Sequence, residues 1–432
     1  MPDFYKKIST LDTSGRVLCG IVLLLPLVRL LLHPNTGIIS SIPLYYSHIS
    51  LAEVLFIIAF ILTKNRQAPN APLFPVVFWL GFSLWLAVSV FNLSVAPSYE
   101  AAAFKTTQFL IHFAFAITLI NYVQHAPKAT EIIIPSVIIA LLLFLPIFLG
   151  TTFLMARDNE HFDWVKSLPG FSNVRHLDYM LGAGLAALGT LPLTHPRILN
   201  SLLRVTAFAV LMLALWVLLF WTGGRGSSIA AIASLGICLI WLRPERWQKL
   251  FQFNLFILIL GAGISAFLPV PDTPSYGLLR FLTKVTEVEN VNAFTAGRLV
   301  IWQQTIDVWK DSPWLGIGPG QTRNVIVAAN NIFTHPHNVF LQAFMAWGIL
   351  GGLPFLAIFI GSLWSIWQSD ELKKSTSAHQ ICGFAMALAI AVNALVDGTL
   401  YHPYPIFLFI LGISVALKPS VKTQSASSLE RS

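Results

Sequence analysis

Long apolar segments alternate with short polar ones along nearly the whole chain. A run of about 20 mainly apolar residues is long enough to cross a bilayer as an α-helix. The pattern predicts twelve such helices, over residues 16–32, 49–63, 72–93, 101–123, 131–154, 179–194, 201–221, 227–242, 249–270, 338–368, 380–397 and 404–418. We therefore expect an all-α integral membrane protein, with residues 1–432 forming a single polytopic membrane domain.

The connection between the ninth and tenth spans is the longest polar part of the chain, over residues 271–336. Within it, apolar side chains recur at helical spacing from Leu299 through Trp302 and Ile306 to Trp309. This spacing predicts a short amphipathic helix that lies on the membrane surface.

Two segments near this helix carry many glycines and prolines. Residues 312–320 contain three glycines and two prolines, which predicts a non-helical turn that serves either as a structural connector or as a phosphate cradle. The tenth span is unusually long, and its Gly351 to Pro354 stretch predicts a kink, because glycine and proline are common at helix bends.

Composition supports the membrane assignment and excludes other classes. Of 432 residues, 56% are hydrophobic and 11% charged, whereas soluble domains carry about 25% charged residues. The three cysteines fall inside predicted spans, so neither a disulfide framework nor a thiolate metal site is expected. The net charge of +8 has no soluble basic domain to concentrate it, and we expect no nucleic-acid partner.

Charge in the short connections predicts the orientation, because Lys and Arg mark the cytoplasmic side. With the N-terminus inside, every predicted inner connection carries at least one cation, and the outer connections at 33–48 and 94–100 carry none. Both termini are therefore predicted to be cytoplasmic, including a C-terminal tail at 419–432, and residues 271–336 form an outer loop.

Several arginines are predicted on the outer side, where the orientation rule does not require them. Arg225 stands between Gly224 and Gly226, ahead of Ser227, in a tight turn before the eighth span. Glycines allow backbone N–H groups to approach an anion, and guanidinium can grip phosphate with two hydrogen bonds. A phosphate site and a simple turn with a surface arginine both remain open.

Arg298 and Arg175 are the other outer arginines of interest. Arg298 begins the predicted surface helix, where the helix dipole disfavours a cation, so a phosphate partner explains it better than a capping role. A solvated arginine at the membrane interface is the alternative. Arg175 precedes His176 and Asp178 at the start of the sixth span, which suits either a local ion pair or a substrate contact.

His335 and His337 form an H-x-H pair where the outer loop meets the tenth span. A histidine at a membrane edge is costly unless it has a partner or a function. His337 could act as a general base toward a hydroxyl group, or be a structural histidine. A zinc site would need a third ligand such as Asp397 or His402. Asp397 could instead orient His337 or bind sugar hydroxyls.

The motifs in this part of the chain resemble those of bacterial O-antigen ligases and the related O-antigen polymerases. The resemblance rests on His337-Asn338 followed after nine residues by Gly348-x-x-Gly351, on Gly-Arg298-x-x-x-Trp, and on Pro313-x-x-Gly-x-Gly. A long outer loop between late spans and a plan of about twelve spans are also similar.

The resemblance implies a GT-C-like glycosyltransferase of the bacterial inner membrane, with its active site on the periplasmic face. Such a ligase moves O-antigen from undecaprenyl diphosphate to the lipid A–core oligosaccharide, with inversion and without a metal or other cofactor. By the same likeness, Arg225 and Arg298 would hold the diphosphate and His337 would activate the acceptor hydroxyl.

We further expect substrate binding from Arg175, His335, Asn338 and Asp397. Membrane lipids surround the protein, and the sequence does not specify an oligomeric state.

Three rivals remain. An O-antigen polymerase uses the same donor but often carries a second large outer loop, which this sequence lacks. A protein O-oligosaccharyltransferase typically has more chain after the histidine motif. A transporter of lipid-linked sugars would place polar residues at the bilayer midplane and often shows internal repeats, and we find neither clearly.

Overall fold

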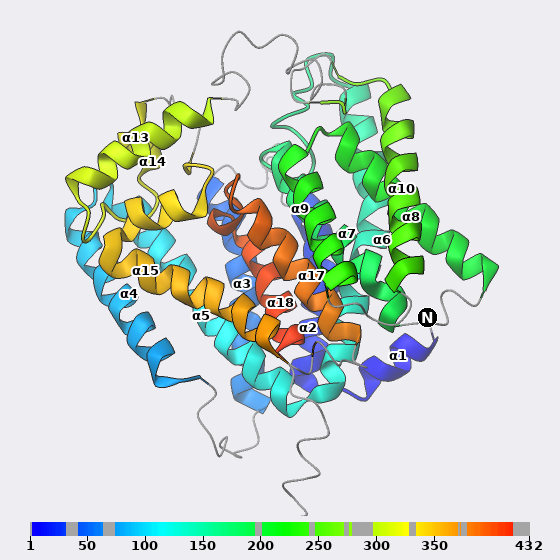
Figure 1. Ribbon diagram of the computed structural model, residues 1–432, viewed down its shortest axis with the longest axis horizontal. Helices are drawn as coiled ribbons and strands as arrows, with labels where there is room; N and C mark the ends of the chain where they lie inside the picture. The colour runs from blue at the N-terminus through cyan, green and yellow to red at the C-terminus, as the bar shows by residue number, and fades with distance from the viewer. Residues whose placement is uncertain are drawn as a thin grey trace, which may run out of the picture.

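The structure is a computed structural model that describes residues 2–31, 42–63, 74–194, 201–241, 247–271, 276–278, 297–327, 334–369, 372 and 378–417. Over these residues it contains helices and no strand (Figure 1). The first half comprises α1 (Pro2–Ser9), α2 (Thr13–Leu31), α3 (Ile42–Thr63), α4 (Val76–Val95), α5 (Tyr99–His125), α6 (Pro127–Arg157) and α7 (Val174–Thr194).

The second half begins with α8 (Leu202–Trp221), α9 (Arg225–Gly236), η3 (Ile237–Trp241) and α10 (Trp247–Phe267). It continues with α13 (Arg298–Asp311), α14 (Thr322–Val325), α15 (Val339–Gln368), α17 (Ala378–Asn393), η5 (Thr399–Tyr401) and α18 (Pro403–Ala416).

Each of the twelve predicted segments overlaps one of these helices, with α9 and η3 together matching the eighth. Seven helices are long and apolar enough to cross a membrane, namely α2, α4, α5, α6, α8, α10 and α15. The chain is therefore a multi-pass membrane protein, and the full count of twelve crossings stays a prediction. The C-terminal tail at 419–432 and much of the loop at 279–296 lie outside the described residues.

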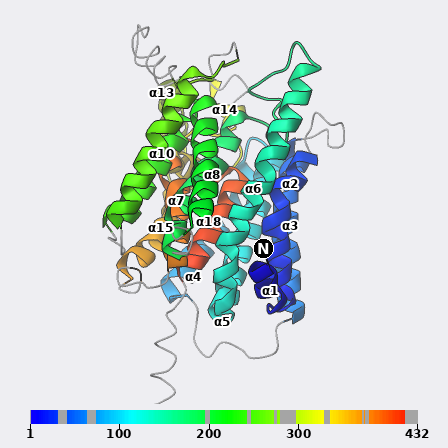
Figure 2. The same cartoon turned by 90° about the vertical axis from the view of Figure 1, so that its right-hand side faces the viewer.

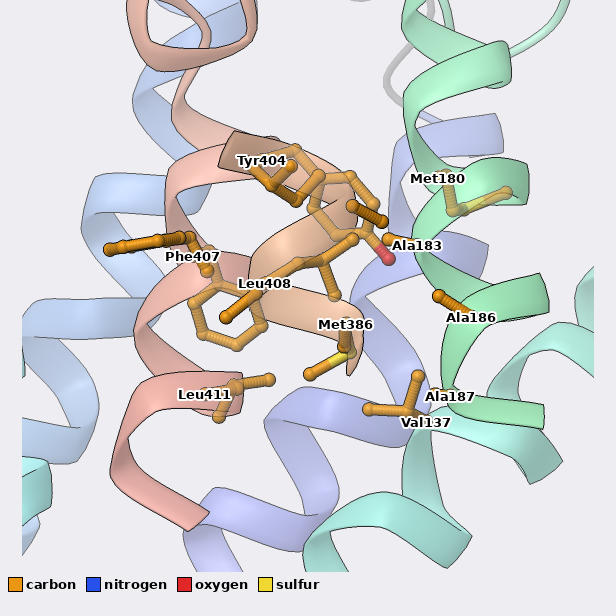
Figure 3. Packing of buried hydrophobic residues seen from close by; sticks show 14 of the residues in the cluster. Val137, Met180, Ala183, Ala186, Ala187, Met386, Tyr404, Phe407, Leu408 and Leu411 are labelled. Atoms are coloured by element: carbon orange, nitrogen blue, oxygen red, sulfur yellow. The ribbon is translucent and has the colours of Figure 1, made fainter. Parts of the chain in front are cut away.

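The centre of the protein is built from α7, α17 and α18, with α17 packed extensively on each of the other two. Figure 3 shows the apolar side chains of α18 facing the small residues Ala183, Ala186 and Ala187 of α7. Where α17 packs on α18, the backbones of Gly383 in α17 and Gly412 in α18 approach so closely that a side chain at either would overlap the other helix. Small residues allow this close helix packing inside a membrane, where lipid removes the usual hydrophobic driving force.

One end of the helical bundle is marked by contacts of residues near the N-terminus. At this end Lys7 of α1 pairs with Glu131 of α6 at 3.0 Å, and Tyr122 of α5 donates to Asp12 at 2.7 Å. We call this the N-terminal end. The opposite end, where α13 and α14 lie at the top of Figure 1, is called the loop end. Figure 2 shows α13 at the same end from the side.

The predicted surface helix is confirmed as α13, although its buried face differs from the expected one. Ile301 and Thr305 are its buried residues, whereas Leu299 is exposed. Ile301 packs with Ile326 and with Met345 of α15. The buried face of α13 therefore rests on the protein.

The kink in α15 lies at Gly348, and the predicted position at Gly351 to Pro354 is wrong. Gly348 has φ 59° and ψ −161°, a backbone conformation open essentially to glycine alone, whereas residues 351–354 continue the helix. The cause is an inserted segment: the turn at residues 313–318 docks its backbone into the break.

This docking replaces the helical hydrogen bonds lost at the break. Ile349 and Leu350 donate to the carbonyls of Pro313 and Trp314, at 2.8 and 3.0 Å. In return, Ile317 and Gly318 donate to α15 carbonyls, each at 2.9 Å. The buried amide of Asn92 donates 2.9 Å bonds to the carbonyl of Leu315 and to that of Ala346, which also accepts from Gly318. Residues 312–320 thus form the structural connector.

A buried ion pair lies inside the bundle, which the sequence reading missed. Glu53 of α3 and His112 of α5 are both shielded from solvent, with His112 Nδ1 2.8 Å from each carboxylate oxygen. Both residues lie near the middle of their helices, where the sequence analysis had singled out no polar group. Mutual pairing offsets the cost of placing them there.

Replacing Gly348 by alanine should destabilise the protein strongly, because a Cβ there would overlap the backbone of Trp314 and Leu315. We expect a loss of about 3 kcal/mol or more in unfolding free energy, measured by thermal unfolding in detergent. Gly361→Ala is the matched control on the same helix, since a Cβ there meets nothing within 4 Å. Equal melting temperatures for the two variants would contradict the docking account.

Candidate functional site

His337 occupies an unusual backbone position just before α15. Its φ of 57° makes it the one described non-glycine residue with positive φ. The next residue, Asn338, caps α15: its side-chain oxygen accepts from the amides of Phe340 and Leu341, at 3.0 and 3.1 Å. Its amide group also donates to Leu395 O at 3.0 Å. Asn338 therefore fixes the helix start and ties it to the end of α17.

Asp397 orients the His337 ring. The carboxylate lies in the connection after α17, and its Oδ1 is 2.7 Å from His337 Nδ1. The same oxygen accepts a 2.8 Å bond from the backbone amide of Gly398. Asp397 is buried, whereas the His337 side chain keeps 13% of its surface exposed. The pair resembles the base-and-orienter arrangement that hydroxyl activation requires.

Arg298 reaches the same carboxylate from α13. Its Nη2 lies 3.5 Å from Asp397 Oδ2, and its side chain is 31% exposed. One turn further along α13, Trp302 Nε1 donates to Pro336 O at 2.8 Å. The surface helix thus contacts Asp397 and Pro336, the residue that precedes His337.

Arg225 begins α9 in a turn supported by a second arginine–aspartate pair. Arg175 Nη1 lies 2.8 Å from Asp178 Oδ2 and 3.0 Å from Thr222 O. The hydroxyl of Thr222 donates to Asp178 Oδ1 at 2.6 Å. A side chain at Gly224 would overlap Asp178, so this glycine is needed for the close approach. The local ion pair expected at the start of the sixth span is therefore present.

The two arginine groups converge at the loop end. Arg175 and Arg298 both lie close enough to Arg225 to repel its charge. Next to Arg225, Asn393 of α17 donates to Ser227 Oγ at 2.8 Å, four residues before Asp397. Among the residues that the structure describes, Arg225 has no acidic partner. A cluster of guanidinium groups with one member unpaired is suited to bind a multiply charged anion.

A row of further histidines stands behind His337, and the sequence did not predict that they lie side by side. His335 Nε2 lies 3.2 Å from His402 Nε2, and the His402 and His176 rings lie 4.0 Å apart. Lys105 of α5 contacts Tyr401 twice, with Nζ 3.0 Å from its carbonyl and 3.7 Å above its ring. No sequence motif links Lys105 to Tyr401 or to the histidines, because α5, η5 and the 334–338 segment are far apart along the chain.

Burial and charge set the protonation of this group. Burial lowers the pKa of His335 and of His402 well below the ordinary value, and the neighbouring histidine charges lower both further. For Asp397, burial alone would raise the pKa. The hydrogen bond from His337 and the charges of His337 and Arg298 outweigh it, so the pKa falls below its usual range. Asp397 is thus a carboxylate, and His335 and His402 are neutral, near neutral pH.

One group among the described residues has the composition of a metal site. His335, His337 and Asp397 each offer an atom within 4.8 Å of the others, which supplies the third ligand that the H-x-H pair lacked. Each side chain already has a hydrogen-bond partner, since His337 Nδ1 faces Asp397 and His335 Nδ1 accepts from the His337 amide at 3.2 Å. The arrangement fits a hydrogen-bonded base better than a preformed metal site.

The structure therefore brings all seven expected site residues to the loop end. His337, Asp397 and Arg298 are in direct contact, and Arg225 and Arg175 lie beside them. His335 and Asn338 hold the backbone and the helix start.

Comparison with known proteins gives two matches. Residues 208–356 match the family model described as O-antigen ligase, a stretch that includes Arg225, Arg298 and His337. A general O-oligosaccharyltransferase of Acinetobacter baylyi (strain ATCC 33305 / BD413 / ADP1) is 32% identical over 140 residues. That match covers 30% of this chain and 23% of the relative, so the chain spans about a quarter of that protein.

The matched region contains the sequence motifs around Arg225, Arg298 and His337, whereas Asp397 and Arg175 of the site lie outside it. Residues 208–356 of this chain are thus similar to the O-antigen ligase family, in agreement with the resemblance that the sequence motifs indicated.

Proposed function

We propose that the protein is an O-antigen ligase of the bacterial inner membrane. It would transfer O-antigen from undecaprenyl diphosphate to the lipid A–core oligosaccharide on the periplasmic face. The observation that carries this proposal is the His337–Asp397 pair in contact with Arg298 and next to the unpaired Arg225. It combines a base for a hydroxyl nucleophile with cations for a diphosphate leaving group.

His337 would take the proton of the acceptor hydroxyl. Asp397 accepts a hydrogen bond from Nδ1, which directs Nε2 toward the proton to be removed. As the proton moves to Nε2, the acceptor oxygen bonds to the anomeric carbon of the donor. The nearby carboxylate stabilises the imidazolium that forms. Attack from the face opposite the diphosphate inverts the anomeric centre.

Arg225 and Arg298 would stabilise the leaving group. The bond between the anomeric carbon and the phosphate oxygen breaks, and negative charge grows on the diphosphate. Fixed guanidinium groups in a poorly solvated site stabilise that charge without reorganising. They could supply the positive charge that a metal provides in other sugar transferases, so we propose metal-independent transfer.

The lipid carrier can reach Arg225 from the side. Ile229 and Ile232 lie on α9 within two turns of Arg225 and are 61% and 44% exposed. Leu395, next to the catalytic carboxylate loop, is 43% exposed. Exposed apolar side chains at this position suit a polyprenyl chain that stays in the bilayer while its diphosphate enters the arginine cluster.

A second candidate function is supported by the Acinetobacter relative, whose description is general O-oligosaccharyltransferase. The base, carboxylate and arginines would serve equally with a protein hydroxyl as acceptor. A polymerase would use a carrier-linked glycan as acceptor. The three reactions share the donor chemistry and differ only in the acceptor, which makes acceptor choice the decisive experiment.

Purified protein would be incubated in EDTA with undecaprenyl-diphosphate-linked glycan and, separately, lipid A–core, an acceptor protein or no further acceptor. Glycan on lipid A–core is the expected product. Glycan on the protein, or longer carrier-linked glycan without another acceptor, would replace the ligase proposal by the corresponding rival. Transfer that requires added metal would contradict metal independence, and no product in any arm would favour a transporter.

His337→Gln should lower the transfer rate constant by about 10²- to 10⁴-fold, because the general base is removed. Asp397→Asn should also lower the transfer rate constant, because His337 Nδ1 loses its carboxylate partner. Initial rates in the same assay measure both effects. His161→Gln, an exposed histidine in the loop after α6, is the control and should keep wild-type activity. Full activity in His337→Gln would refute the base assignment.

Arg225→Ala and Arg298→Ala should each weaken transition-state stabilisation by about 3 kcal/mol, or roughly 10²-fold in rate. Lysine at either position should restore activity only in part, because it lacks the planar fork of guanidinium. Arg157→Ala, which removes one partner of an exposed ion pair with Asp158, is the control. Complete rescue by lysine would indicate general charge attraction in place of specific diphosphate contacts.

A further inference from the structure

We propose that His335 is a positioning residue, which holds His337 in its left-handed backbone conformation by accepting a hydrogen bond from the His337 amide. This inference rests on the proposed function, in which His337 is the base. It assigns His335 a role without substrate contact, whereas the sequence suggested substrate binding.

The contact has the form of a local side-chain turn. His335 Nδ1 lies 3.2 Å from the amide nitrogen of His337, two residues further along the chain. Asparagine and aspartate side chains often accept from the amide two residues on, and so stabilise a tight turn. A left-handed conformation costs a non-glycine residue roughly 1–2 kcal/mol, so an added hydrogen bond helps to hold it.

His402 fixes the tautomer that this contact needs. Nδ1 of His335 can accept only if the proton of the neutral ring sits on Nε2. That Nε2–H faces His402 Nε2 at 3.2 Å, which can accept it. His402 in turn stacks on His176, so the pair of rings is held from behind.

The ring of His335 is also enclosed. Only 5% of its surface is exposed, so a substrate has little access to it. Any side chain at Gly398 would overlap the imidazole, and Gly398 is the residue that donates to Asp397. The His335 ring therefore contacts His337 directly and packs against Gly398, the residue next to Asp397.

Two substitutions separate the hydrogen-bond acceptor from the ring. His335→Asn keeps an acceptor for the amide two residues on but removes the ring, whereas His335→Phe keeps a ring without an acceptor. We expect His335→Phe to lower kcat by about 10- to 100-fold with KM for both substrates unchanged, because the base is displaced. We expect His335→Asn to retain most of the wild-type kcat.

A second readout does not depend on transfer. Hydrogen exchange of the His337 amide, followed in a peptide spanning residues 334–340, should be faster in His335→Phe than in wild type. It should stay slow in His335→Asn. Likewise, His402→Leu should speed exchange, whereas His402→Gln, which retains an oxygen acceptor for the His335 Nε2–H, should not.

Equal exchange in wild type and His335→Phe would overturn the proposal, as would a raised KM with unchanged kcat, which would indicate substrate contact. Loss of kcat to the same extent in the Asn and Phe variants would also overturn it. If the wild-type protein transfers glycan to no acceptor, the proposed function fails, and the exchange measurement still decides the role of His335.

Discussion

Backbone groups inside a bilayer must find partners within the protein, and this constraint governs the region around the site. The break at Gly348 removes several helical hydrogen bonds of α15 at a position that is buried inside the protein, where water cannot replace them. The turn at 313–318 and the amide of Asn92 provide the substitutes. The first part of α15, which begins two residues after His337, is therefore hydrogen-bonded to the turn at 313–318.

The site uses a small number of charges, each shared between two tasks. Asp397 orients His337 and also lies against Arg298, while Asp178 holds Arg175 and supports the turn before Arg225. In a poorly solvated region each carboxylate limits the repulsion among the arginines. Positive charge is left in excess at Arg225, where an anionic substrate can neutralise it.

Much of this could be predicted from the sequence because hydropathy and short motifs are local signals. The helices, the surface helix and the residues of the site follow from such signals, and the resemblance added their roles. The contact of His337 with Asp397, across 60 residues, was one of three roles for Asp397 that spacing could not separate. Lys105 and the Glu53–His112 pair were missed, since a single ionisable residue in an apolar run shows no partner until the helices pack.

The docking of the 313–318 turn divides the outer loop into two parts that differ in their tolerance of insertions and deletions. Gly316 and Gly348 meet backbone to backbone, with a Cβ at Gly316 only 2.6 Å from backbone atoms of α15. One added residue between Ser312 and Gly318 would bring a side chain into that contact and shift Arg298 relative to His337. A change of loop length before Gly297, in contrast, leaves the chain length between Arg298 and His337 and the contact of Gly316 with Gly348 unchanged.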